Sequence, residues 1–413
     1  MTIQGTAGTL TNSVRTAYSN VYLEGAKEAR VYDMFATAAG AYGVEQAAAL
    51  NSTIQIPFLS DMQITETAIS QVSDINPQTL RDATFTLTPV SRADALQVSE
   101  ILKLEAYTNY GESLYKRIGR NMMETVDLLA QAAALKGENL IRATVRTSLD
   151  AGTTAHNISN TSFTQARSTL EGLRCPAYVG NGRAQFLALG HPDVFFDMRV
   201  ANDIVSVAYY QDKEILFNGE IGSFENFKIL TPTWAKVFYG AGVANGSTQA
   251  TTLSTAANAL ATTFNVGTAG SNIQAGRYLN IGTRETGNTH YPMNERVKVY
   301  ASYSTGLTIS AIGEGANGGL RFPHASGEAV NNNDSVYPVV WGSPASLVKL
   351  YANGLGAGDP LASGMDEYGC VVGPKLDGLV NQFWSIGWKW YGQYGRISEN
   401  WLVRGEFSTR LDA

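Results

Sequence analysis

The sequence predicts an α+β protein whose helix and strand signals occupy separate stretches of the chain. Two stretches, 53–58 and 84–88, alternate apolar and polar residues with the period of two that is typical of strands. Farther along, apolar residues recur every three or four positions from Tyr107 to Leu129, which predicts a long helix. A third observation is a run from 237 to 276 without one charged residue, which leads into short strands. Together these patterns predict an α+β fold.

Charge is scarce in this chain. Its 413 residues carry 30 Lys+Arg and 36 Asp+Glu, a formal net charge of −6, and charged residues make up 16% of it, against about 25% in ordinary soluble domains. The apolar fraction of 44% excludes a disordered chain, and no stretch approaches the ~20 apolar residues of a membrane span. The acidic balance argues against whole-surface attraction to nucleic acid. One physical reason for so uncharged a surface is that neighbouring molecules cover much of it.

Nothing in the sequence predicts export or metal binding. Residues 1–5 show no cationic segment followed by an apolar one, so we expect no secretory signal. Cys175 and Cys370 lie far apart with no CxxC or Cys/His spacing, so we expect buried small residues and neither a disulfide nor a metal site. These observations indicate a chain made in a reducing cytoplasm.

The first hundred residues predict an arm followed by a projecting hairpin. Residues 1–50 combine a polar start with a helical pattern and indicate an arm rather than a compact domain. The two strands within 51–98 are joined by a polar stretch, 61–81, in which Asn76-Pro77 marks a turn. So long a connection is uncommon inside a compact domain, so we expect an extended hairpin that needs a partner.

The strongest local signal predicts one helix over 97–136. Its apolar stripe consists of Tyr107, Tyr110, Leu114, Ile118, Met122, Val126 and Leu129. Gly111 and Gly119 interrupt the stripe, each at a cost of roughly 1 kcal/mol relative to Ala, and Gly137 is a plausible stop. A helix this long has no partner helix next to it in sequence, so it must pack against another element.

The middle of the chain mixes helices and strands and then becomes all-β. We expect a helix over 161–174, a buried strand over 186–189, a helix opened by Gly190-His191-Pro192-Asp193, and strands within 221–239 with a turn at Thr231-Pro232. Residues 241–336 have no helical period, and short strands at 278–281, 296–300 and 307–309 are separated by Gly and Asn turns. This predicts a small all-β module inserted between the flanking segments.

The last stretch, 381–413, predicts an antiparallel hairpin with an aromatic face. Trp384, Ile386, Trp388 and Trp390 share one face, a turn lies around Gly392 and Gly395, and Ile397, Glu399, Trp401, Val403 and Phe407 follow on alternating positions. Such a face could be a sugar-stacking platform, but strict strand alternation is more often core.

No active site emerges from the sequence. The P-loop, HExxH and GxSxG motifs are absent. His191 with Asp193 and Asp197 could form a metal or acid–base group, but Pro192 and Asp193 are better explained as a helix start. We expect His324 to be structural, and His156 and His290 have no partner spacing. We therefore predict no catalytic, cofactor-binding or metal-binding residues, no cofactor, and a protein that is not an enzyme.

The order of these pieces resembles the major capsid proteins of tailed bacteriophages, which share the shell fold named after phage Hong Kong ninety-seven. Within that fold the chain looks most like the podovirus-type branch first described for a phage called N-four. The resemblance rests on Asn76–Leu80, Leu96–Glu100, Leu189–Val194, Gly219–Gly222, Phe227–Ile229 and Ser385–Trp390, in that order. It covers the chain outside 241–336.

The resemblance implies a role for each segment. In chain order these are an N-terminal arm (1–50), an extended loop lying on a neighbouring subunit (51–98), the spine helix and peripheral domain (97–150), the first part of the axial domain (151–240), an inserted, small barrel-like β domain (241–337), the axial return (338–380) and the closing strands of the peripheral domain (381–413). The insert, with Gly276–Gly282 and Pro323–Val330, resembles small β modules embedded in phage structural proteins, and we expect it on the outer surface.

The resemblance also implies function and partners. The chain would form hexamers and pentamers of an icosahedral head around double-stranded DNA, contacted without sequence preference, after synthesis in the bacterial cytoplasm and with no membrane. It would work with a portal, a separate scaffolding protein and possible decoration or cement proteins. No lysine lies between Lys27 and Lys103, so the loop cannot supply the crosslinking lysine that some members of the fold carry. The alternatives are a nanocompartment shell resembling encapsulins and a carbohydrate-binding, β-rich virion surface protein.

Overall fold

The chain divides into two compact units in the computed structural model. Unit 1 comprises Met1–Asp127 and Val348–Ile397, and unit 2 comprises Leu128–Leu347 and Ser398–Ala413. The residues that the structure describes are 22–26, 30–42, 53–59, 62, 64, 77–99, 110–180, 183–200, 205–206, 220–243, 250–267, 275–285, 291, 293–303, 308–312, 319–351, 370–377 and 383–412. The stretch 381–413, expected to belong to one domain, is split between the units after Ile397.

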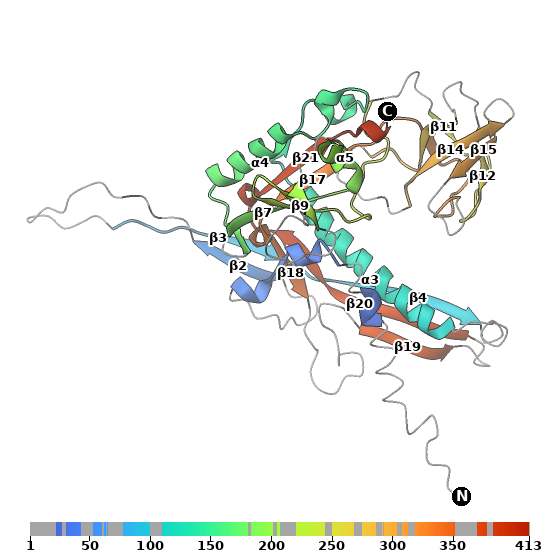
Figure 1. The fold of residues 1–413 in the computed structure, drawn as a ribbon. Helices are drawn as coiled ribbons and strands as arrows, with labels where there is room; N and C mark the ends of the chain where they lie inside the picture. Colours follow the sequence, from blue (N-terminus) through green and yellow to red (C-terminus); the bar gives the residue numbers. More distant parts are fainter. Residues whose placement is uncertain are drawn as a thin grey trace, which may run out of the picture. The chain divides into compact units, whose positions relative to one another are not determined.

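Unit 1 is built on a five-stranded sheet. Its order is β1 (Thr37–Ala38), β18 (Leu347–Tyr351), β20 (Phe383–Arg396) and β19 (Cys370–Asp377), and β4 (Val90–Ser99) also pairs with β20. The long strand β20 is antiparallel to both β19 and β4, whereas β1 and β18 run parallel. In Figure 1, β4, β20 and β19 lie side by side along α3 (Tyr110–Leu135).

The predicted spine helix does not extend back to residue 97. Within 97–136 only Tyr110–Leu135 is described as helix, and 97–99 belong to β4, so the expected start of the helix is wrong. Residues 97–99 form strand instead of helix because they belong to β4, in which ten residues pair with β20. The stripe is confirmed at Ile118, Met122 and Val126, which are buried. Tyr107 and the side chain of Tyr110 lie outside the described residues. The Trp388 indole N–H also donates to Asn121 Oδ1 on α3 (2.8 Å).

Gly119 permits a close contact within unit 1 instead of merely interrupting the helix. Residues 22–26 are helical, and Tyr22 and Ala26 of this turn are buried. A Cβ added at Gly119 would overlap the carbonyl of Tyr22, and one added at Gly25 would overlap the carbonyl of Lys116. The two glycines therefore let two helical backbones approach more closely than side chains would permit.

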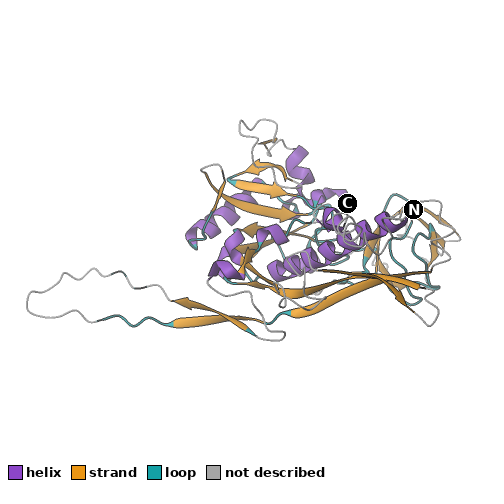
Figure 2. Ribbon diagram, turned by 90° about the horizontal axis from the view of Figure 1, so that it is seen from below, coloured by secondary structure: helices purple, strands orange, loops and turns teal. Residues whose placement is uncertain are grey.

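A second pair of strands in unit 1 forms the predicted hairpin. β2 (Ile54–Leu59) and β3 (Asp82–Leu87) are antiparallel, with Ile56 opposite Phe85. Figure 2 shows them as a two-stranded ribbon leading away from the sheet of unit 1. Most of the connecting polar stretch lies outside the described residues.

Unit 2 contains an eight-stranded mixed sheet. The order is β5 (Leu140–Ile141), β21 (Leu402–Phe407), β17 (Tyr337–Gly342), β7 (Arg183–Gly190), β10 (Phe227–Leu230), β9 (Glu220–Phe224) and β8 (Val205–Ser206), and β6 (Tyr178–Gly180) pairs with β7. The helix predicted over 161–174 is α4 (Asn160–Gly172), and Phe163 on it makes edge-to-face contacts with Phe227 and Trp341 at 5.5 Å. The turn between β9 and β10 falls at Glu225-Asn226, both at positive φ. The turn expected at Thr231-Pro232 follows β10, where the Ala235 N–H donates to the Pro232 carbonyl (3.1 Å).

The predicted all-β stretch forms a six-stranded antiparallel sheet in unit 2. Its order is β11 (Ala250–Thr252), β16 (Ala329–Asn331), β13 (Tyr278–Ile281), β14 (Glu295–Tyr303), β15 (Thr308–Ile312) and β12 (Thr263–Asn265). The Ser254 N–H donates to the Asn265 carbonyl (2.9 Å) and the Gly267 N–H to the Thr252 carbonyl (2.7 Å), so the two end strands are also joined. We call residues 250–331 the β-rich module.

The β-rich module has its own apolar core. The buried residues of that core are Leu253, Ala257, Phe264, Val266, Leu279, Ile281, Val297, Val299, Leu320 and Val330. Leu279 and Ile281 on β13, and Val297 and Val299 on β14, lie at every second position, so one face of each of these strands forms the core.

The hairpin predicted for the last stretch is not formed. β20 continues straight through Gly392 and Gly395, and β21 lies in the sheet of unit 2. A Cβ at Gly392 would overlap the Leu350 carbonyl, and one at Gly395 would lie 2.5 Å from the Phe85 ring. These glycines therefore permit close packing in unit 1. From the sequence alone, a glycine at a close contact cannot be distinguished from a glycine in a turn.

Short helical segments complete the described structure. They are η1 (Asp33–Phe35), η2 (Ala39–Tyr42), η3 (Arg146–Ser148), η4 (Thr154–His156), η5 (Pro192–Phe195), α5 (Phe196–Val200), η8 (Pro344–Ser346), η9 (Glu399–Trp401) and η10 (Arg410–Asp412). No helix in these described ranges is long and apolar enough to cross a membrane.

Replacing Gly119 with Ala tests the close helix contact. Helix propensity alone would make Ala more favourable by about 1 kcal/mol, but overpacking against the Tyr22 backbone costs about 1–3 kcal/mol. We therefore expect Gly119→Ala to lower the free energy of unfolding, measured by urea denaturation followed by circular dichroism. Gly172→Ala is the matched control, because nothing lies within 4 Å of the added Cβ on α4. Equal stability of the two variants would contradict the contact.

Candidate functional site

The base of the β2–β3 hairpin is anchored in unit 1. Ile56 and Leu87, one from each strand, are buried in a small cluster with Val348 and Leu350 of β18. Phe85 lies over Gly395, where no side chain could fit. Full burial of side chains of this kind contributes about 1.5–3 kcal/mol each, so the start of the hairpin has a fixed position within unit 1.

The far end of the hairpin presents large apolar side chains to solvent. The exposed fractions are 72% for Leu59, 64% for Met62, 87% for Ile64 and 53% for Leu80. The strand signal in the sequence predicted the hairpin but not these residues, because single apolar residues in a polar stretch carry no periodicity. We call Leu59, Met62, Ile64 and Leu80 the hairpin tip. Several large apolar side chains exposed on one projecting segment are typical of a surface that another molecule covers.

A buried aspartate pins the chain just before β1. Asp33 accepts a hydrogen bond from the Tyr394 hydroxyl (2.5 Å) and pairs with Lys349 Nζ (3.2 Å) and Arg30 Nε (2.6 Å). Asp127 of α3 accepts the backbone N–H of Asp33 (2.8 Å). This part of the expected arm is therefore integrated into unit 1, and residues 1–21 of it lie outside the described ranges.

The His324 side chain lies between two carboxylates in the β-rich module. Its Nε2 lies 2.7 Å from Glu295 Oε1 and its Nδ1 lies 2.6 Å from Glu328 Oε2. Burial alone would lower the pKa of His324, but the two carboxylate hydrogen bonds outweigh it and raise the pKa. Backbone N–H groups of Arg321 and Ala325 donate to the same carboxylates. The arrangement fixes the loop before β16, which agrees with the structural role predicted for His324.

A second buried charge cluster lies at the edge of the unit 2 sheet. Glu406 on β21 is fully buried, and Arg142, Arg146 and Arg404 all pair with it. Burial favours the neutral acid, but the hydrogen bond from Arg146 and the three positive charges hold the pKa of Glu406 below its usual range. Such a carboxylate serves to hold its surroundings together and has no proton to exchange near neutral pH.

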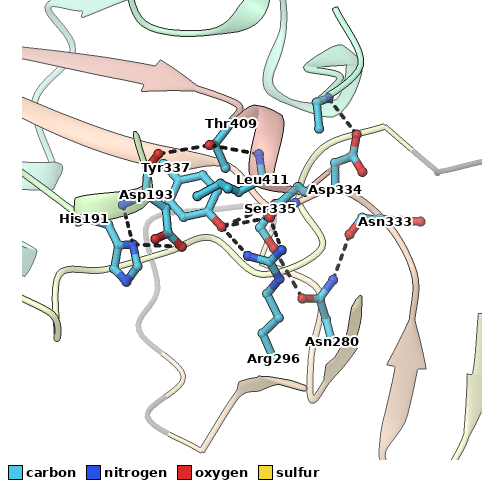
Figure 3. A network of polar contacts seen from close by, with 12 residues as sticks. His191, Asp193, Asn280, Arg296, Asn333, Asp334, Ser335, Tyr337, Thr409 and Leu411 are labelled. Atoms are coloured by element: carbon cyan, nitrogen blue, oxygen red, sulfur yellow. Dashed lines mark hydrogen bonds and ion pairs between the residues drawn. The ribbon is translucent and has the colours of Figure 1, made fainter. Parts of the chain in front are cut away.

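The β-rich module is joined to the rest of unit 2 by a polar network (Figure 3). Arg296 on β14 pairs with Asp412 of η10 and donates to the Tyr337 hydroxyl. The Tyr337 hydroxyl donates in turn to Asp412 Oδ1 (3.1 Å). Asn280 on β13 donates to the Asn333 carbonyl (2.8 Å). We call the contact between 238–243, 333–336 and η10 the module joint.

The histidines and aspartates considered for chemistry are placed in structural roles. His191 precedes η5 and its Nδ1 accepts the Asp193 N–H (3.3 Å), so the predicted helix start is confirmed. Asp197 pairs with Arg410 (3.3 Å), and His156 Nδ1 accepts the Asp150 N–H (3.0 Å). His290 lies outside the described residues. Within the ranges that are described, no group of three or more His, Cys, Asp or Glu side chains could hold a metal ion.

The remaining candidates are packing residues. Cys175 is buried, and burial raises the pKa of its thiol to about 12, so it is not a reactive thiolate. The side chain of Cys370 is outside the described part of the chain. Ile386, Trp388 and Trp390 are 2–5% exposed, so this part of the aromatic face of β20 is core and its described side chains form no stacking platform. The side chain of Trp384 lies outside the described part of the chain.

Comparison with known proteins identifies the fold. No protein-family model and no curated protein matches the chain. Among solved structures, the capsid of Ralstonia phage GP4 matches 88% of this chain and 85% of that chain, with a TM-score of 0.50 and 8% sequence identity. The capsid of cyanophage Pam1 matches 88% and 87%, with a TM-score of 0.46 and 10% identity. An encapsulin complex from Synechococcus elongatus matches 79% and 77%, with a TM-score of 0.39 and 8% identity.

The chain therefore has the shell fold of phage capsids. The match to the Ralstonia phage capsid spans most of both chains, so it concerns the whole architecture and not one shared motif. The α+β fold class is confirmed, and so is the resemblance stated from the order of the pieces. The narrower N-four-like branch remains a prediction.

His324→Ala tests the carboxylate pair. Removing the imidazolium leaves Glu295 buried without its cationic partner, which costs about 3–5 kcal/mol of unfolding free energy. Because the pKa of His324 is raised, its stabilising effect is present below about pH 6.5 and is lost as the pH rises through the raised pKa. We expect calorimetry to show a large loss in the variant at acidic pH and a smaller one at alkaline pH. Glu328→Ala is the control with a smaller expected loss, because that side chain is one-third exposed. A pH-independent loss would contradict the assignment.

Proposed function

We propose that this chain is the major capsid protein of a tailed bacteriophage, which self-assembles into hexamers and pentamers of an icosahedral head around double-stranded DNA. The phage capsid fold supports this function. The observation that carries it on this chain is the hairpin, whose base is buried in unit 1 while its tip exposes four large apolar side chains. No described part of the same chain covers this tip, and a shell of identical chains supplies a neighbour at every position.

Each segment has a proposed role in the shell. The hairpin of β2 and β3 within 51–98 lies over a neighbouring subunit, and the segment 1–50 includes the N-terminal arm. Unit 1, with β4, β18, β19 and β20, forms the peripheral region. The eight-stranded sheet of unit 2, to which β7, β10, β17 and β21 belong, surrounds the hexamer and pentamer centres, and the insert 241–337 faces outward. The absence of lysine between Lys27 and Lys103 supports a shell that is stabilised by non-covalent burial or by cement proteins.

The proposed partners follow from the same role. The chain is made in the bacterial cytoplasm and becomes part of the virion. A separate scaffolding protein guides its assembly, a portal occupies one vertex, and decoration proteins can bind the outside. DNA is contacted without sequence preference, and we assign no enzymatic activity and no cofactor.

The hairpin tip provides the direct test. We expect the triple variant Leu59→Asp, Met62→Asp, Ile64→Asp to fold normally, because these side chains are already in solvent within the subunit. It should fail to form closed shells, because each buried apolar side chain contributes about 1.5–3 kcal/mol and the loss is repeated at every subunit contact. Negative-stain microscopy and mass photometry compare its particles with those of the unchanged chain.

The matched control is Leu260→Asn on the β-rich module. Leu260 is 54% exposed and lies at φ 68°, a conformation that Asn tolerates better than Leu. If the insert faces outward, this change leaves assembly intact. Normal shells from the triple variant would contradict the role of the hairpin, as would those from a chain lacking 62–80.

A further inference from the structure

Three buried polar side chains meet where the chain enters the β-rich module. Lys236 lies between β10 and the module, Glu285 follows β13, and Asn294 directly precedes β14. Their exposed fractions are 7%, 0% and 9%, so water has almost no access to them. An amine, a carboxyl group and a primary amide therefore share one enclosed site.

The Glu285 carboxylate connects the other two side chains. Its Oε2 lies 2.5 Å from Lys236 Nζ, and its Oε1 accepts a hydrogen bond from Asn294 Nδ2 (3.0 Å). One carboxylate thus contacts both an amine and the nitrogen of an amide, which is the position of a group that can pass a proton from the first to the second.

The amide of Asn294 is held in place by the backbone on its other side. Its Oδ1 accepts the Thr283 N–H (3.0 Å), and its Nδ2 also donates to the Thr283 carbonyl (2.6 Å). Gly282 lies at φ 115°, and a Cβ there would overlap Asn294 Oδ1. The Thr283 N–H polarises the amide carbonyl and is placed to stabilise negative charge that develops on Oδ1.

Burial favours the neutral forms of Lys236 and Glu285. It lowers the pKa of Lys236 and raises the pKa of Glu285, while the attraction between the two side chains opposes both shifts. Lys236 Nζ lies 5.9 Å from the centre of the Phe238 ring. When the proton moves from the ammonium to the carboxylate, the buried pair loses its charge and the amine becomes a nucleophile.

The neighbouring arginines are engaged with other groups. Arg284 donates to backbone carbonyls of the module joint (2.8 and 3.0 Å), and Arg146 pairs with Glu406. Arg146 also lowers the pKa of Glu285, but by less than Lys236 does. Lys236 is therefore the cation that acts most strongly on the Glu285 carboxylate.

We propose that these side chains form an amide crosslink within the chain, in which Lys236 Nζ is bonded to Asn294 Cγ and Glu285 is the acid–base group. Glu285 accepts a proton from the Lys236 ammonium, and Nζ then forms a bond to Cγ. The carboxyl group gives its proton to Nδ2 as the Cγ–Nδ2 bond breaks, and it takes up the second proton that Nζ loses. Ammonia leaves, and no oxidant, reductant or co-reactant is needed.

The crosslink fastens the β-rich module covalently at its entry. Lys236 lies outside the module and Asn294 within it, so the new bond joins the module to the preceding part of unit 2. The reaction occurs once in each chain, so it is a modification and not an enzymatic activity. It joins residues of one chain and does not depend on the proposed shell function.

The mass of the denatured full chain tests the crosslink. We expect a mass below that of the sequence by one ammonia, about 17 Da, after any removal of Met1 is accounted for. Trypsin should release a branched peptide that contains both Lys236 and Asn294. A succinimide elsewhere gives the same mass loss but leaves Lys236 unmodified, so the branched peptide is decisive. The full sequence mass, or a loss of water (about 18 Da) that places the bond on Glu285, would overturn the proposal.

Two variants assign the roles. Lys236→Arg keeps the positive charge without a nucleophilic amine, and Glu285→Gln removes the proton acceptor, so both should keep their full sequence mass. Lys349, buried beside Asp33 (3.2 Å), is the internal control, and its tryptic peptide should be linear. A branched peptide that persists in Glu285→Gln would contradict the role of Glu285. The unchanged chain remains decisive even if neither variant folds.

Discussion

A two-stranded hairpin cannot bury its own side chains, and this constraint governs how the protein can be used. Near its base, Ile56 and Leu87 are covered by β18, so the hairpin leaves unit 1 from a fixed position. Toward its end no part of the described chain covers Leu59 or Ile64. The base of the hairpin is therefore packed within the subunit, whereas the described side chains of its tip are exposed to solvent. In our account a neighbouring subunit covers these side chains, so the contact that stabilises a shell is already built into the fold of each chain.

The scarcity of charge has a more specific meaning once the structure is known. Several of the few charged residues are placed inside the units, where they hold segments that are distant in sequence. Asp33 with Lys349 fixes the chain before β1, Glu406 gathers three arginines, and Arg296 with Asp412 fastens the β-rich module. Burying such pairs rarely adds much net stability, but removing one partner is costly, so they determine which segments lie together. A chain with so few charges suits a protein whose surface is largely covered in an assembly.

Periodic patterns in the sequence predicted the elements well, and contacts between distant residues account for the differences. The strand at 278–281, the helix near 161–174 and the pairing of 54–59 with 82–87 each depend on local spacing, and the structure has all of them. Residues 97–99 fit a helical stripe but form strand because β20 offers them a pairing edge. Gly119, Gly392 and Gly395 appeared to be helix interruptions and turn residues, whereas each permits a close approach of another segment. The hairpin tip and the module joint could not be predicted, because isolated apolar residues and single aspartates carry no pattern until the fold brings their neighbours to them.

The central claim is that the hairpin tip of one chain is buried on another chain within a closed shell. Cryo-electron microscopy of particles formed when the chain is expressed with its neighbouring genes tests it most directly. Our account predicts closed icosahedral shells built of hexamers and pentamers, in which Leu59, Met62 and Ile64 of each subunit are covered by a neighbouring subunit. Shells in which these three side chains face solvent, or a chain that remains monomeric under these conditions, would contradict it.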